Sequence, residues 1–331
     1  MEGGGAGVAG SMRLETGRTR AEWAEWLVEL GAETPRMVVG IDCCFSYPAW
    51  FLAEHGCGSV FDFWRAVVGD ATTTATAAPT ATTAATATAA ATATRAARTM
   101  AAATATADAM KAATTTAKIA GMGEEWLHRA CEDGRFWGVT GPGRTGKRPE
   151  EFSGEGLRRM MRTTDWENKI AVRMAGGDAE RAEKMKGITA KSPFQIGGSG
   201  SVGTGSLRAM PVLERLREAG FRVWPFEDVE FGEKAPRPLL VEMYTRLLTG
   251  PVAKSNGVAR RAYLLAKRKT DALYAGLGRG VLAKAYASED AFDALVSCVE
   301  MVRWRGEFAG LKATRDEVLR LEGITWRPGV R

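Results

Sequence analysis

The sequence has little of what marks membrane, secreted or zinc-binding proteins. No run of 18 apolar residues occurs among its 331 residues, which excludes a membrane-spanning helix. The opening residues, MEGGGAGVAGS, contain neither the basic nor the apolar segment of a secretory signal. The five cysteines form no disulfide pattern, and the two histidines lie far from any Cys-x-x-Cys pair. We therefore expect a cytoplasmic protein with reduced thiols and no membrane contact.

Neither sign of charge dominates strongly, whereas alanine and threonine fill one segment. The 45 basic and 39 acidic residues give a net charge of +6, which permits contact with a phosphate backbone without demonstrating it. Residues 71–120 contain 41 Ala or Thr and five charged residues, without a periodic apolar face. This composition predicts a disordered low-complexity insertion. We expect residues 1–12 to form a flexible tail and residues 13–331 a single domain around the insertion, because the length suffices for one core.

Helix-like and strand-like segments alternate along the rest of the chain. Trp23, Trp26, Leu27 and Leu30 recur at helical spacing, and the β-branched run MVVGID is typical of a buried strand. The alternation predicts an α/β fold. The expected helices cover residues 19–33, 59–70, 123–131, 155–186 and 288–304. The expected strands cover residues 37–42, 221–226 and 238–244. Residues 191–220 are expected to form a short strand, a glycine-rich loop and a helix.

Four acidic residues lie at positions where burial of a carboxylate costs free energy. Asp42 ends the first predicted strand, Glu242 interrupts PLLVEMY, and Asp290 and Asp293 lie one turn apart on the last helix. A partly desolvated carboxylate needs a donor, a cation or a metal, and several that converge repel one another unless a divalent ion lies between them. A shared metal site is therefore one interpretation. The simpler one is turn capping by Asp42 and stabilisation of the helix dipole by the other pair.

The glycine-rich loop leaves three interpretations open. Gly198, Gly200 and Gly203 match the spacing G-x-G-x-x-G. Such a loop is a turn that needs positive φ, a phosphate site at a helix N-terminus, or a dinucleotide site. Pro193 in the preceding strand and Pro211 in the following helix argue against the dinucleotide site.

The segment from Phe136 to Arg148 combines aromatic with basic residues. This combination grips single nucleic-acid strands in some proteins, because bases stack on the aromatic rings. A solvated lid anchored by Trp137 is the alternative. Nucleic acid is therefore a possible partner of this loop, and the oligomeric state is left open.

The chain resembles domain-of-unknown-function family 429 in five segments, which occur in this order: VVGIDCCFSYPAWFL, FWG-x-x-G-P-G-R-x-G-K-R-P, KSPFQIGGSGSVGTGSLRAMPVLERLREAGFRVWPF, PLLVEMYTRLLTGPVAKS and DAFDAL. The resemblance covers roughly residues 13–70 and 121–326, and the long glycine-rich segment is its most specific part. It implies an RNase H-like fold, in which helices flank a mixed sheet, and a nuclease that uses Mg²⁺ or Mn²⁺.

The resemblance also implies roles for individual residues. Asp42, Glu242 and Asp293 would be catalytic and would hold two ions, with Asp290 as a further metal ligand. A second group would position the phosphate backbone and comprises Lys191, Gly197, Gly198, Gly200, Gly203 and Ser206.

The chain departs from this family at its N-terminus. Members open with a strand that carries a further metal-binding Asp, and MEGGGAGVAGS has no counterpart of it. We therefore expect an RNase H-like sheet that is incomplete at the N-terminus and a metal site that lacks one acid. The leading expectation is a metal-dependent nuclease or phosphodiesterase of doubtful activity. The alternatives are a nucleic-acid- or phosphate-binding protein without catalysis, a dinucleotide-binding enzyme and a non-functional remnant.

Overall fold

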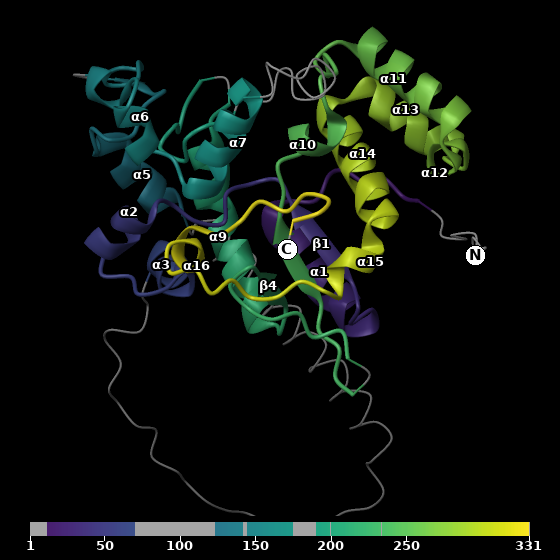
Figure 1. Cartoon of the computed structure of the whole chain (residues 1–331), viewed down its shortest axis with the longest axis horizontal. Helices are drawn as coiled ribbons and strands as arrows, with labels where there is room; N and C mark the ends of the chain where they lie inside the picture. The colour runs from purple at the N-terminus through teal and green to yellow at the C-terminus, as the bar shows by residue number, and fades with distance from the viewer. Residues whose placement is uncertain are drawn as a thin grey trace, which may run out of the picture.

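The structure is a computed structural model that describes residues 12–69, 123–141, 144–174, 190–198, 200–232 and 234–330. Two predictions concern residues outside these ranges: the flexible tail, of which only Met12 is described, and the insertion at residues 71–120. Within the described residues, helices surround a small central sheet (Figure 1). The predicted α/β class is confirmed.

Three parallel strands form the central sheet, in the order β1 (Val38–Ile41), β5 (Leu239–Glu242) and β4 (Arg222–Trp224). All three lie inside the predicted strands, and β5 is buried along its whole length, as expected of an apolar run in a parallel sheet. The register of β1 and β5 sets Ile41 opposite Glu242. The carboxyl ends of these two strands therefore lie side by side, and Asp42 follows directly.

The part of the sheet that the structure describes has no antiparallel strand, whereas the resemblance implies a mixed sheet. Among the described residues, the central sheet has only parallel pairings, and β2 (Thr140–Gly141) and β3 (Arg144–Thr145) form a separate antiparallel hairpin. The strand expected near residue 195 is a single bridge between Trp137 and Gln195. Pro193, which has no backbone N–H, explains why this segment does not extend into a paired strand.

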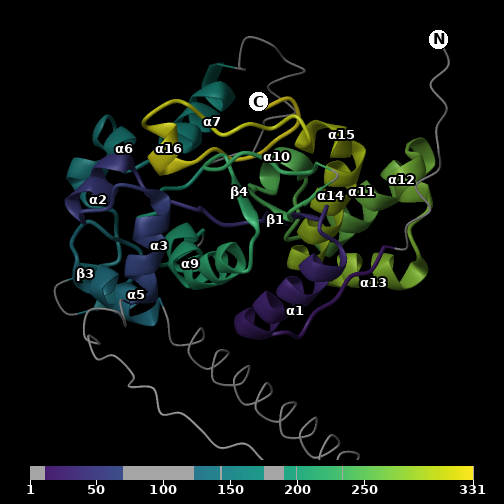
Figure 2. The same ribbon diagram turned by 90° about the horizontal axis from the view of Figure 1, so that it is seen from below.

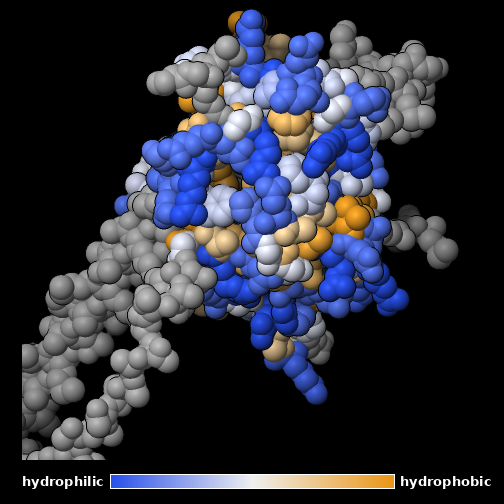
Figure 3. Space-filling view, turned by 90° about the vertical axis from the view of Figure 1, so that its left-hand side faces the viewer, coloured by the Kyte–Doolittle hydropathy of each residue, from blue (hydrophilic) through white to orange (hydrophobic). Residues whose placement is uncertain are grey.

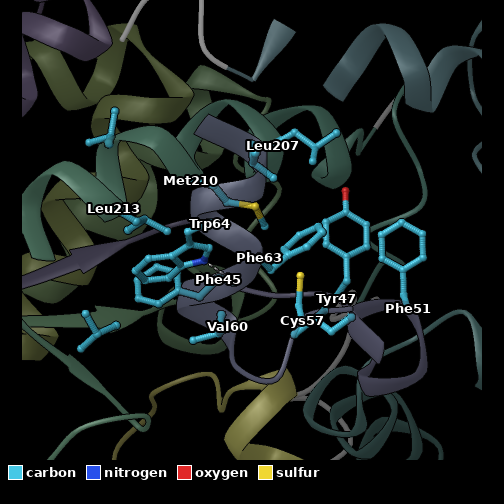
Figure 4. Close-up of a cluster of buried hydrophobic side chains, with 14 of the residues drawn as sticks. Phe45, Tyr47, Phe51, Cys57, Val60, Phe63, Trp64, Leu207, Met210 and Leu213 are labelled. Carbon is cyan, nitrogen blue, oxygen red and sulfur yellow. Dashed lines mark hydrogen bonds between the residues drawn. The ribbon is translucent and has the colours of Figure 1, made fainter. Parts of the chain in front are cut away.

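Helices α1 (Arg20–Glu33), α3 (Val60–Val68), α5 (Glu124–Glu132) and α9 (Val202–Glu218) pack together beside the sheet, with α9 in contact with the other three (Figures 1 and 2). Side chains from the segment after β1, from α2 (Ala49–Glu54) and from α3 fill the space next to α9 (Figure 4). The buried indole of Trp64 donates a hydrogen bond to the Phe45 carbonyl over 2.7 Å. This core fixes the chain that follows β1, and with it Asp42.

The C-terminal segment covers the other face of the sheet. It contains α15 (Arg305–Phe308) and α16 (Leu319–Glu322) and returns to β5, where the backbone of Trp326 bridges to that of Met243. Phe308 and Trp326 stack with ring centroids 4.7 Å apart and pack on apolar side chains of β4 and β5. Alternate residues of β5 thus serve two different cores, as expected of a strand between two layers.

A helical unit follows β5 and has an apolar core of its own. It comprises α10 (Arg246–Thr249), α11 (Gly257–Thr270), α12 (Ala272–Ala275), α13 (Arg279–Ala287) and α14 (Glu289–Arg303). Helices α11, α12 and α13 lie at one end of the molecule, and α14 lies between them and the sheet (Figure 1). The predicted Ser288 cap is confirmed, because its hydroxyl accepts the Ala291 N–H. This cap sets the helical register of Asp293.

The opposite end of the molecule carries α6 (Gly156–Arg159), α7 (Thr163–Met174) and the 3₁₀ turn Glu150–Phe152. Helices α6 and α7 fall in the predicted helical stretch from residue 155 onward, and the 3₁₀ turn precedes it; the part of the stretch from residue 175 to 186 lies outside the described residues. The face seen from this end is mostly hydrophilic, with only small apolar areas (Figure 3). In the described part of the chain, no helix has the length and apolar character needed to cross a membrane.

Candidate functional site

A pocket of about 410 Å³ lies at the carboxyl ends of β1 and β5. Ligands of open α/β sheets bind at this edge, because the loops that leave the strands diverge there. The volume is within the range of small-ligand sites. The charged and hydroxyl-bearing residues that line the pocket are Asp42, Arg162, Asp165, Lys191, Ser201, Glu242, Tyr244, Thr245, Lys254 and Thr325.

Asp42 and Asp293 approach each other through residues of this pocket: Asp42, Thr245 and Lys254 line it, and Asp293, which does not line it, contacts Thr245 and Lys254. Thr245 lies between them, with its hydroxyl oxygen 3.2 Å from Asp42 Oδ2 and 3.3 Å from Asp293 Oδ2. A hydroxyl carries one proton and donates it to one carboxylate at a time. The hydroxyl therefore stabilises only one of the two carboxylates, and the other needs a proton or a cation.

Burial and mutual repulsion disfavour the two negative charges. Solvent reaches Asp42 through the pocket, but protein atoms surround its carboxylate. This burial, and then the negative charge of Asp293, raises the pKa of Asp42 to about 6. Burial also raises the pKa of Asp293, in opposition to a hydrogen bond from Lys254.

Lys254 supplies one positive charge to the pair. Its ammonium donates to Asp293 Oδ2 and lies 3.5 Å from a carboxylate oxygen of Glu289. Burial alone would lower the pKa of Lys254, but the hydrogen bond to Asp293 and its charge raise it. Asp293 Oδ1 is buried without a hydrogen-bond partner. One ammonium thus serves two carboxylates, Asp293 and Glu289, and one buried Asp293 oxygen lacks a donor or a cation.

Glu242 has a different environment, dominated by Arg162. The fully buried Arg162 guanidinium donates to both Glu242 oxygens over 2.6 Å each. The Phe45 N–H and the Thr325 hydroxyl add hydrogen bonds of 2.7 and 2.8 Å to the same carboxylate. Arg162 also donates to Asp165 over 2.8 and 3.0 Å. Although burial opposes a charged guanidinium, Asp165 and Glu242 raise the pKa of Arg162 well above its usual value.

These contacts favour a structural role for Glu242. Four hydrogen bonds converge on its two oxygens and link β5 to the start of α7 and to the C-terminal segment. Cys44, Asp165 and Glu242 also bring possible ligand atoms within 4.8 Å of one another. However, burial raises the pKa of Cys44, which keeps it a thiol, and the Arg162 guanidinium already donates hydrogen bonds to both acids. The metal-binding and catalytic roles of Glu242 stay predictions, and Asp42 and Asp293 fit an ion better.

Part of the predicted phosphate-binding group reaches the pocket. Lys191 and Gly200 line it, together with Ser201 and Val202 at the start of α9. Ser201 makes no side-chain cap hydrogen bond, so the positive end of the α9 dipole is presented to the pocket without a side-chain cap. A phosphate group fits such a helix end.

The other members of that group serve packing in this structure. A Cβ on Gly203 would lie 2.0 Å from the Pro193 carbonyl oxygen, and one on Gly197 would lie 2.2 Å from a neighbouring carbonyl oxygen. Gly198 has a φ of +73° and open space around it, as in a turn. The buried Ser206 hydroxyl accepts the Cys44 N–H over 3.0 Å, which ties α9 to the chain after β1.

The remaining predicted features lie away from the pocket or are buried. Asp290 is exposed on the first turn of α14 and does not line the pocket. Trp137 is buried in the core, so its ring supports the anchored-lid interpretation more than base stacking. The dinucleotide interpretation lacks its strand, because a single bridge precedes the glycine loop in the described residues and Gly203 lies inside α9.

The sequence analysis did not single out Arg162, Asp165, Thr245 or Lys254. The spacing of Arg162 and Asp165 is that of an ion pair on one helix face, but many exposed pairs share it. Thr245 and Lys254 follow β5 closely, and residues after a strand of a parallel sheet are candidates for its ligand-binding edge. That rule would have found both.

Comparison with protein-family profiles, curated proteins and solved structures finds no match. The resemblance to family 429 therefore stays a prediction, and the function has to be argued from the pocket.

Proposed function

We propose that the protein is a divalent-ion-dependent phosphodiesterase, specifically a nuclease of the RNase H-like class. The observation that carries the proposal is the convergence of Asp42 and Asp293 around Thr245, with Asp293 Oδ1 buried and unpartnered. Two repelling carboxylates and an orphaned oxygen are what a cation site presents when its charge is not balanced by the protein.

The donor atoms fit Mg²⁺ or Mn²⁺, which prefer oxygen ligands. Asp42 and Asp293 would hold the ion, and the Thr245 hydroxyl is a further oxygen beside them. When bound, such an ion supplies Lewis-acid activation of water and charge stabilisation at a phosphoryl group. The Arg162 guanidinium already donates to both oxygens of Glu242. The described residues therefore favour a site for one ion over the two ions that the resemblance implies.

The protein's own groups would position the substrate. Lys254 fixes the Asp293 carboxylate through its ammonium. Lys191 and the positive end of the α9 dipole offer positive charge on the same pocket, where the phosphate of a diester would lie, although the N–H groups of Val202 and Gly203 already bond to backbone carbonyls. Arg162 and Glu242 hold the floor of the pocket rigid, which keeps these groups in position.

The RNase H-like part of the proposal draws its support from topology. Asp42 follows one parallel strand and Asp293 lies on the first turns of the last long helix, as the resemblance implies. The three strands alone are common to many α/β folds, so the acids carry this part of the argument.

Hydrolysis of bis(4-nitrophenyl) phosphate and of a labelled oligonucleotide tests the proposal. We expect cleavage with Mn²⁺, none with EDTA, and a loss of at least about a hundredfold in Asp42→Asn and Asp293→Asn. Asp290→Asn and the exposed Glu317→Gln serve as matched charge controls and should keep activity close to that of the unaltered protein.

Two results would contradict the proposal. Activity that survives Asp293→Asn would place the chemistry elsewhere. Salt-sensitive binding of oligonucleotides without cleavage under Mg²⁺ or Mn²⁺ would favour a binding protein without catalysis.

A further inference from the structure

The positive charge of the chain is concentrated in one helical segment. Residues 251–287 contain eight of the 45 basic residues and one of the 39 acidic residues, a net charge of +7. The other 294 residues together carry a net charge of −1. The basic character of the protein therefore belongs to α11, α12, α13 and the loop before them, at one end of the molecule (Figures 1 and 2).

Helix α11 separates an apolar inner side from a basic outer side. Tyr263 and Leu264 pack into the core that α11 shares with α13 and α14. Arg261, Arg268 and Lys269 are exposed, and their spacing of seven and eight residues places them along one side of the helix. We call these three residues the basic face; it extends over roughly 12 Å of helix.

The charge of the basic face is not balanced by the fold. Among the residues that the structure describes, none of the three forms an ion pair with a carboxylate. Asp271, the single acid of the segment, is paired with Arg303 of α14. Clustered cations repel one another and weaken the folded state, so the arrangement is best explained by an anionic partner.

We propose that the basic face binds the phosphate backbone of a nucleic acid, which makes a polynucleotide the substrate of this protein. The inference rests on the proposed function only for the cleavage of the bound strand. Lys254 connects the two sites, because it lies three residues before α11 and its ammonium bonds to Asp293. The loop before α11 therefore reaches the pocket, which Lys254 lines.

An anionic membrane is the less suitable partner for this surface. The large apolar residues exposed on α11, all of whose residues the structure describes, are Val258 and Leu265. Neither of them is aromatic. Helices that bind in a lipid interface instead present a broad apolar face with aromatic anchors.

Fluorescence anisotropy of short labelled oligonucleotides, single-stranded and duplex, tests the proposal in EDTA with the full chain. Arg261→Glu, Arg268→Glu and Lys269→Glu are combined in one variant. We expect at least about tenfold weaker binding at low salt. The slope of log affinity against log salt should fall by about 2 for single strands and about 3 for duplexes, since three phosphate contacts are lost.

The matched control combines Lys312→Glu, Arg315→Glu and Arg320→Glu, three exposed residues in α16 and in the segment that precedes it. It changes the net charge equally and should leave affinity nearly unchanged. A milder variant, Arg268→Gln with Lys269→Gln, should weaken binding in the same direction and guards against misfolding of the charge-reversed protein.

Equal losses in both charge-reversed variants, unchanged binding in the α11 variant, or no binding by the unaltered protein would overturn the proposal. Binding to phosphatidylserine vesicles in preference to oligonucleotides would also overturn it. EDTA removes divalent ions, so the assay measures binding without cleavage. Its results are therefore independent of the Mn²⁺-dependent hydrolysis that tests the proposed function.

Discussion

Replacing Asp42 with Asn is expected to stabilise the metal-free protein. The carboxylate is crowded by protein atoms and by the charge of Asp293, and its pKa is raised from 3.8 to about 6. A raised carboxyl pKa means that the folded state holds the proton more tightly than the unfolded chain does. Ionisation of Asp42 therefore lowers the free energy of unfolding as the pH rises from about 4 through 6.

The magnitude follows from that pKa. Each pKa unit corresponds to about 1.4 kcal/mol, so the full difference is about 3 kcal/mol. Solvent reaches the Asp42 carboxylate through the pocket and screens its charge, so the expected effect is about 1–1.5 kcal/mol. Asp42→Asn should raise the free energy of unfolding by this amount at pH 8 and by much less at pH 4.5, where the folded carboxyl is already protonated.

Urea denaturation in EDTA at the two pH values measures the effect. Asp62→Asn is the control of opposite sign, because the Asp62 carboxylate accepts a 2.8 Å hydrogen bond from Ser59 at the start of α3, which lowers its pKa. That variant should be less stable at pH 8. Destabilisation by Asp42→Asn at pH 8, or an equal gain at both pH values, would refute the reasoning.

Three further predictions concern the surroundings of the pocket. Arg162→Met leaves the carboxylates of Glu242 and Asp165 buried without their cation and should lower the free energy of unfolding by about 3–5 kcal/mol in urea denaturation at pH 8; a change under 1 kcal/mol would contradict the anchoring role. Gly203→Ala should destabilise the protein far more than Gly198→Ala, because its Cβ would lie 2.0 Å from a carbonyl oxygen, and thermal unfolding of the two variants compares them. Thr245→Val should weaken Mn²⁺ affinity by about tenfold in calorimetric titration, because it removes the hydroxyl between the two acids; unchanged affinity would exclude that role.

Elements with a strong local pattern were predictable from the sequence. The apolar run before Asp42 and the Ser288 cap before α14 became a strand and a helix as expected, because their local preferences agree with the packing. The strand expected around Pro193 did not form, since that segment pairs through one bridge. Local sequence does not show which strands lie next to each other, so the parallel pairing of β1 with β5 needed the structure.

The site was predictable only in part for a related reason. A strand-end acid is visible in the sequence, and Asp42 and Asp293 do meet. Whether a neighbouring cation already neutralises an acid depends on long-range contacts. Arg162 lies 80 residues from Glu242 and holds both of its oxygens, and no local pattern reports that contact.

Direct measurement of Mn²⁺ binding tests whether Asp42 and Asp293 hold an ion. Free Mn²⁺ gives an electron paramagnetic resonance signal that diminishes on binding, so a titration yields affinity and stoichiometry without any substrate. We expect one ion per chain, lost in Asp293→Asn and in Asp42→Asn and retained in Glu317→Gln. Binding that persists unchanged in both aspartate variants, or no binding by the unaltered protein, would contradict the account.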